Sequence, residues 1–213
     1  MATIEQNQEK VLLLLNSVKR EGMQNLIDWL KTTDYFTAPA AQSHHSNFEG
    51  GLISHCLKVY KVFKDNCERH KTKINLSEES IIIISLLHDL CKVNFYKPIK
   101  KMAKSESSNN QWVYIPAYEI EEEFPYGHGE KSVDIIRDFI KLTDEEKLCI
   151  RWHMGPYEGE IKWRDFGNAC DKYDSVYLFH VSDNISSKFY EKEIERESLI
   201  KMAFGRGDFV NKR

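Results

Sequence analysis

The sequence predicts an all-α helical bundle with a small β-hairpin excursion. Three observations support this fold class: apolar residues recur at helical spacing along most of the 213 residues, capping patterns precede some of these segments, and one short region reads as strands. With 41% hydrophobic residues the chain can bury the core of a single domain. We expect an N-terminal helical extension packed on the core (residues 1–32), a main domain (33–203) and a C-terminal tail (204–213).

In the first half of the chain, apolar spacings of three and four predict helices separated by an aperiodic loop over residues 33–48. These helices cover residues 4–20, 22–32 and 49–69. Ser77 is a candidate N-cap for a further helix, in which Ile81–Leu87 are apolar on nearly every side. That helix should therefore be central.

The sequence in the middle of the chain predicts the small β-hairpin excursion. Residues 97–110 are rich in Lys, Ser and Asn, and Trp112–Ile115 and Tyr118–Ile120 flank Pro116 and Ala117 like a short hairpin. The helical pattern then resumes at Gly127.

The last part of the chain predicts two more helices. Thr143 and Glu146 match a capping box for a helix that ends near Met154. Residues 157–168 look like a loop that could lie over a site, and a long final helix is expected over about 169–189.

Composition excludes several classes of protein. The net charge of −3 does not favour a protein that binds duplex nucleic acid by charge alone. The longest strongly apolar stretch is far shorter than the roughly 20 residues of a membrane span. The start of the chain does not resemble a secretory signal, and the five cysteines form no Cys-x-x-Cys pair. We expect a cytoplasmic protein with no membrane partner, whose oligomeric state the sequence leaves open.

Polar residues interrupt the inward faces of several predicted helices, and together they form a candidate metal site. Its members are His55, His88, Asp89, His128, His153 and Asp183. The adjacent pair His88 and Asp89 ends the most apolar helix, where burying both without partners would cost several kcal/mol. Imidazoles with carboxylates suit one or two divalent transition-metal ions such as Fe, Mn, Ni, Co or Zn.

Such a site favours phosphate chemistry. Two divalent ions and two aspartates leave net positive charge, which attracts phosphate oxygens and lowers the pKa of a bound water. Lys92 and Lys131, each one turn after a candidate ligand, could add phosphate contacts. Arg164 is a further candidate for substrate binding, because it lies in the segment expected to cover the site.

Two strings carry a resemblance to a known family. Residues 50–55 (Gly-Gly-Leu-Ile-Ser-His) and 86–92 (Leu-Leu-His-Asp-Leu-Cys-Lys) resemble the opening motifs of the HD superfamily of metal-dependent phosphohydrolases, and Asp183 resembles its closing aspartate. Residues 36–48, with His44 and His45, resemble the catalytic domain of bacterial HD-type 3′-to-5′ exonucleases, as do Gly127–Glu130 and Trp152–Gly155. The similarity spans roughly residues 36–190.

The resemblance implies roles for the motif residues. One ion would be held by His55, His88, Asp89 and Asp183, and a second by Asp89, His128 and His153. Asp89 and Lys92 would be the catalytic residues, with His44 and His45 near the substrate.

Two departures qualify the resemblance. Met154 stands where relatives with His-His offer another imidazole, and we do not expect the short helical start to supply the nucleic-acid-binding barrel that the exonucleases carry at their N-terminus. The expected partner is therefore a small phosphorylated substrate, either a nucleotide or a short single-stranded nucleic acid.

Two other functions remain open. The same four-His, two-Asp set resembles that of the di-iron oxygenases of this superfamily, such as myo-inositol oxygenase. A metal-bound module that senses a ligand without turnover is the other alternative. Iron in the purified protein would favour the oxygenase, whereas manganese, nickel or zinc would favour hydrolysis.

Overall fold

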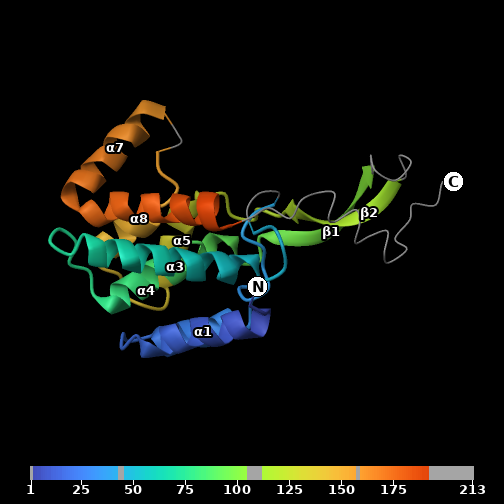
Figure 1. Cartoon of the computed structure of the whole chain (residues 1–213), viewed down its shortest axis with the longest axis horizontal. Coiled ribbons are helices and arrows are strands. Elements are labelled where there is room, and N and C mark those ends of the chain that lie inside the picture. Colours follow the sequence, from blue (N-terminus) through green and yellow to red (C-terminus); the bar gives the residue numbers. More distant parts are fainter. Residues whose placement is uncertain (1, 43–45, 105–111, 157–158, 192–213) are drawn as a thin grey trace.

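The computed structural model describes residues 2–42, 46–104, 112–156 and 159–191, and Figure 1 shows them as a layered helical body with a projecting two-stranded ribbon. The helices are α1 (Ile4–Ser17), α2 (Met23–Lys31), α3 (Gly51–Arg69), α4 (Glu78–Leu87), α5 (His128–Arg137), α6 (Asp144–Arg151), α7 (Gly159–Lys172) and α8 (Asp174–Ile185). A 3-10 turn, η1 (Leu90–Lys92), follows α4, and a π-helical turn, η2 (Ser186–Tyr190), follows α8. The ribbon consists of β1 (Tyr96–Lys104) and β2 (Trp112–Ile120). The predicted all-α class with a small hairpin is confirmed.

The core lies around α3, α4 and α8. The α4 helix is buried from Ser80 to Leu87, as expected for a helix that is apolar on all sides. Helix α3 packs against both α4 and α8 (Figure 1). Helix α6 contacts the same two partners. These four helices therefore form the centre of the body.

Capping residues set where the helices begin. The Ser77 hydroxyl accepts the backbone N–H of Ser80 at the start of α4, which confirms the predicted cap. The Thr143–Glu146 capping box is present in full at the start of α6.

The N-terminal helices pack on the body through apolar and ionic contacts. Helix α1 contacts α3 and α4, and α2 begins after Gly22, whose φ of 85° favours glycine. A Cβ at Gly22 would lie 1.9 Å from the carbonyl oxygen of Phe139. Nearby, the Arg20 guanidinium donates to both carboxylate oxygens of buried Glu146 at 2.7 and 2.9 Å. This two-point contact ties the connection between α1 and α2 to α6.

The expected pairing within the hairpin was wrong. Pro116 and Ala117 do not form a turn; they lie inside the continuous strand β2, which pairs antiparallel with β1 from Tyr96 opposite Ile120 to Lys104 opposite Trp112. The sequence did not reveal β1, because its lysine-rich pattern lacks the apolar alternation of a strand. The pairing with β2 supplies the strand structure that local preference does not.

The loop expected over residues 157–168 was also wrong where the structure describes it, because α7 occupies Gly159–Lys172. This helix buries Phe166 and Ala169 and packs on α8. The single final helix expected over 169–189 is instead the end of α7, followed by α8 and η2. Within the described residues, no helix combines the length and apolar character that a membrane crossing requires.

Candidate metal centre

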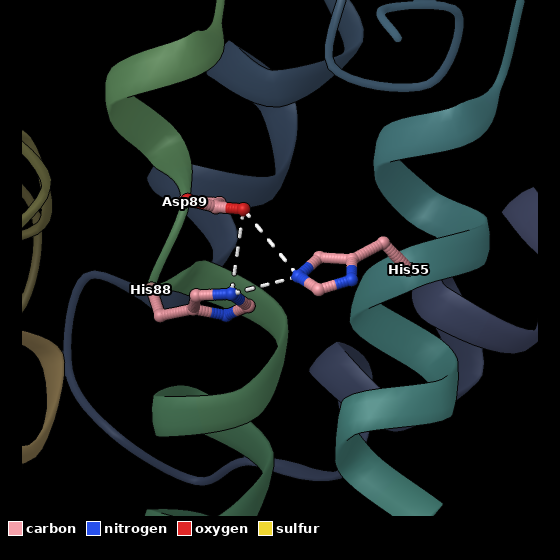
Figure 2. A group of neighbouring side chains, drawn as sticks. All are labelled: His55, His88 and Asp89. Atoms are coloured by element: carbon pink, nitrogen blue, oxygen red, sulfur yellow. Dashed lines mark hydrogen bonds and ion pairs between the residues drawn. The ribbon is translucent and has the colours of Figure 1, made fainter. Parts of the chain in front are cut away.

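Four of the six predicted ligands meet directly. The Nε2 atom of His55 lies 3.2 Å from Nε2 of His88, 3.2 Å from Oδ1 of Asp183 and 3.5 Å from Oδ2 of Asp89. Figure 2 shows the ring of His55, on α3, facing the ring of His88 and the carboxylate of Asp89. All four side chains are buried or nearly so. The structure therefore brings together residues that are up to 128 positions apart in the sequence (183 − 55).

The fifth residue, His153, completes this cluster from the end of α6. Its Nε2 lies 3.4 Å from Oδ1 of Asp89, and neither atom has a hydrogen-bond partner among the described residues although both are buried. Ligand atoms of His88, His153 and Asp183 all lie within 4.8 Å of one another, as do those of His55, His88 and Asp89. The two sets share His88, so the cluster is continuous.

The histidine tautomers follow from the contacts of the other ring nitrogens. The Nδ1–H of His88 donates to the carbonyl of Ser85 at 2.9 Å, and that of His153 donates to the carbonyl of Ile150 at 2.7 Å. Their Nε2 atoms therefore present lone pairs to the carboxylates of the cluster. Lone pairs that face one another at 3.2–3.4 Å repel unless a cation or a proton lies between them.

The electrostatics of the cluster also favour a cation. Burial lowers the pKa of His88, which keeps this imidazole neutral and able to act as a ligand. Burial would raise the pKa of Asp89, but Lys92 and His88 outweigh it and hold that pKa well below its usual range. Burial would lower the pKa of His55, yet the hydrogen bonds to Asp183 and Glu191 raise it to about 10. The carboxylates that attract a proton to His55 would equally attract a metal ion.

Lys92 lies beside the cluster. Its Nζ donates to Oδ2 of Asp89 at 2.8 Å, and its side chain is only 12% exposed. Although burial would lower the pKa of Lys92, the negative charge of Asp89 raises it above its ordinary value. Lys92 is therefore a fixed positive charge next to the candidate metal ligands.

His128, the sixth predicted ligand, stands at the edge of the group. It begins α5, its Nδ1 lies 3.4 Å from Sγ of Cys91, and its side chain is exposed. Gly129 allows α5 to approach the end of α6, since a Cβ there would lie 2.2 Å from the carbonyl oxygen of Arg151. Although His128 makes no direct contact with the four central ligands among the described contacts, it lines the same cavity.

This cavity opens over the cluster of candidate ligands and has a volume of about 440 Å³. Five of the six predicted ligands line it, and the sixth, His88, is fully buried and contacts His55 and Asp89. Its other walls come from Lys92, Tyr96, Ile120, Met154, Asn184, Ser187, Lys188 and residues 40–42. The volume suits a small molecule of nucleotide size.

The predicted substrate-binding residues are placed differently. Lys131 donates to Glu122 at 2.8 Å and lies outside the walls of the cavity, although it follows His128 by one turn of α5. Arg164 lies on α7, with a side chain that is 73% exposed, and does not line the cavity. His44 and His45 lie outside the described residues.

The sequence did not indicate that Glu191 belongs to the site. Glu191 accepts the Nδ1–H of His55 at 2.7 Å and the hydroxyl hydrogen of Ser46 at 2.6 Å. Burial would raise its pKa, but the hydrogen bond from His55 and the charge of that ring lower it to about 2. Glu191 is therefore an ionised carboxylate behind a candidate metal ligand, the arrangement that orients histidines in many metal sites.

The helical bundle and its cluster of His and Asp side chains define a helical domain with a site suited to divalent metal. The sequence profile of the HD domain matches residues 52–203, and the protein therefore belongs to the HD domain family. Members of this family are typically metal-dependent phosphohydrolases that bind divalent ions through His and Asp side chains. The match does not single out the exonuclease branch. Comparisons with curated proteins and with solved structures returned no match.

Proposed function

We propose that this protein is a metal-dependent phosphomonoesterase or phosphodiesterase that acts on a nucleotide or short oligonucleotide through a metal-activated water. The observation that carries the proposal is the buried pair of lone-pair atoms, Nε2 of His153 and Oδ1 of Asp89, which face each other at 3.4 Å without a hydrogen bond. A divalent ion would satisfy both atoms, and the neighbouring donors are those that transition metals prefer.

The proposed ligand assignment uses the cluster as two overlapping sets. His55, His88, Asp89 and Asp183 would hold one ion, and Asp89, His128 and His153 would hold a second. Asp89 can serve both because its two oxygens face different imidazoles: Oδ2 faces His55 and His88, and Oδ1 faces His153. When bound, the metal supplies a water of lowered pKa and positive charge for phosphoryl oxygens.

The protein groups around the metal provide orientation and charge. Lys92 keeps Asp89 ionised and directs positive charge toward the cavity, where it would bind a phosphoryl oxygen. Asn184, Ser187 and Lys188 line the same cavity, where they would add polar groups and a further cation around a bound ligand. Because the candidate metal ligands line this cavity, the phosphate of a bound nucleotide would lie next to them.

The proposal is tested by removing metal with a chelator and then adding back Mn, Co, Ni, Zn or Fe singly. Release of phosphate, nucleoside or nucleotide from a panel of nucleotides and short oligonucleotides is measured for each metal. We expect hydrolysis with at least one metal, lost in His153→Ala and retained in His70→Ala, which removes an exposed histidine at the end of α3. A metal-replete protein that hydrolyses nothing in the panel would contradict the proposal. Oxygen consumption that requires iron would instead support the oxygenase alternative.

A further inference from the structure

The two faces of the β ribbon differ in chemistry. Side chains of paired strands alternate between faces, so residues opposite one another in the register share a face. One face, which we call the inner face, carries Ala103 and Val113, both buried, together with Ile115. The other face, which we call the outer face, carries the pairs Met102 with Tyr114 and Lys104 with Trp112.

The outer face combines exposed aromatic rings with positive charge. Trp112 is 45% exposed and Tyr114 is 38% exposed, although large aromatic side chains are usually covered. Lys100 and Lys104 lie on this face and are exposed. The two strands contain four lysines and a single acid, Glu119, which lies on the inner-face register opposite Lys97. The outer face of the strands therefore carries positive charge without a compensating carboxylate.

The outer face runs into the cavity above the metal cluster. Tyr96 and Ile120, the pair at the base of the ribbon, share the outer-face register and line that cavity. The ring of Tyr96 lies 6.3 Å from the ring of Tyr118, the next aromatic residue along this face. From Tyr96 the strand extends over nine residues, roughly 27 Å, away from the body (Figure 1). A ligand on the ribbon would therefore continue into the metal site.

We propose that the outer face of the ribbon binds a single-stranded nucleic acid and leads one end of it into the metal-binding cavity. The proposal rests on the proposed phosphohydrolase function and identifies the surface that recognises its substrate. Exposed rings offer stacking surfaces to successive bases, and the lysines between them neutralise the phosphates that connect those bases. A duplex hides the faces of its bases within the stack, so these rings would add nothing to its binding. The outer face therefore binds single strands in preference to duplexes, because only unpaired bases can stack on its rings.

Binding is tested with the full chain in a chelator, so that hydrolysis does not consume the probe. Fluorescein-labelled dT12, U12 and a 12-base-pair DNA duplex are titrated by fluorescence anisotropy at several salt concentrations. We expect the Trp112→Ala, Tyr114→Ala double variant to bind at least about 25-fold more weakly, from about fivefold or more per lost stacking ring. Substituting phenylalanine at the same two positions keeps a ring and should keep most of the affinity.

A matched pair of charge variants tests the assignment of the face. Lys100→Ala with Lys104→Ala removes two charges from the outer face and should lower the slope of log affinity against log salt by about 1.4. Lys97→Ala with Lys101→Ala removes two charges from the same strand on the inner-face register and should leave the affinity nearly unchanged. Circular dichroism melting of each variant checks that the fold is retained.

The outcomes separate this proposal from the proposed function. Equal losses in the two lysine pairs, equal affinity for duplex and single strand, or no binding at low salt would each overturn the ribbon proposal. Because anisotropy is measured without turnover, an inactive protein that still binds dT12 through the outer face would contradict only the hydrolase assignment. An active enzyme that binds no oligonucleotide would contradict only the ribbon.

Discussion

Glu191→Gln is the most informative single change near the metal centre. The carboxylate of Glu191 accepts hydrogen bonds from Nδ1 of His55 and from the hydroxyl of Ser46 at 2.7 and 2.6 Å. Glutamine has nearly the same shape and retains one acceptor oxygen, but it removes the negative charge behind His55. The change therefore separates the charge of Glu191 from its packing.

The expected magnitude follows from the geometry. Glu191 contacts Nδ1 of His55 and not the candidate ligand atom Nε2; it fixes the ring and makes Nε2 more basic. Loss of such a partner in other metal sites lowers metal affinity by about 10- to 100-fold. We expect the same range here for Mn or Zn binding at pH 7, with little loss of stability because the amide still accepts one hydrogen bond.

The assay is competition between the apo-protein and a chromophoric chelator, with thermal melting as a check on folding. Glu146→Gln serves as a control, because Glu146 is also fully buried but pairs with Arg20 away from the cluster. This control should melt at a lower temperature and keep its metal affinity. If folded Glu191→Gln protein binds metal as tightly as the unchanged protein, Glu191 does not position His55 and the reasoning fails.

Three further predictions concern the cluster and the N-terminal extension. Asp89→Asn should reduce hydrolysis by more than about 100-fold and lower the metal content measured by elemental analysis, whereas normal turnover would contradict its role as a shared ligand. Lys92→Met should lower kcat/KM by about 10- to 100-fold, from loss of a charge-assisted hydrogen bond, while metal content stays near normal. Arg20→Ala should lower the free energy of unfolding in urea by about 2 to 3 kcal/mol, and an unchanged midpoint would show that the pair is not stabilising. Arg20 and the N–H of Thr143 hold the pKa of Glu146 below its ordinary 4.5 despite burial. The stabilisation by the Arg20–Glu146 pair should therefore be present above pH 4.5 and be lost as the pH falls through the lowered pKa of Glu146.

The sequence predicted those parts of the fold that depend on local patterns. Ser77 and the Thr143–Glu146 box mark helix starts through contacts within four residues, so they can be recognised without the rest of the chain. The pair His88 and Asp89 was recognisable because two polar groups at the end of an apolar helix need partners.

The parts that the sequence missed depend on distant partners. Strand β1 forms because it pairs with β2, and no local preference of Lys100 or Lys101 indicates it. Helix α7 exposes 64% of Trp163 while burying Phe166, so its apolar residues do not form a clean helical stripe. Glu191 belongs to a charged segment without periodicity, and its contact with His55 spans 136 residues.

The need for Glu191 can be traced to where each histidine lies on its helix. His88 and His153 follow the ends of α4 and α6, where carbonyls lack partners within the helix, so their Nδ1–H groups donate to the carbonyls three residues earlier. The same contact satisfies the helix end, fixes the tautomer and directs Nε2 toward the cluster. His55 lies in the first half of α3, where the carbonyl three residues earlier is already committed to the helix. Its ring requires an acceptor from elsewhere, and the carboxylate of Glu191 supplies it together with a charge that a carbonyl lacks.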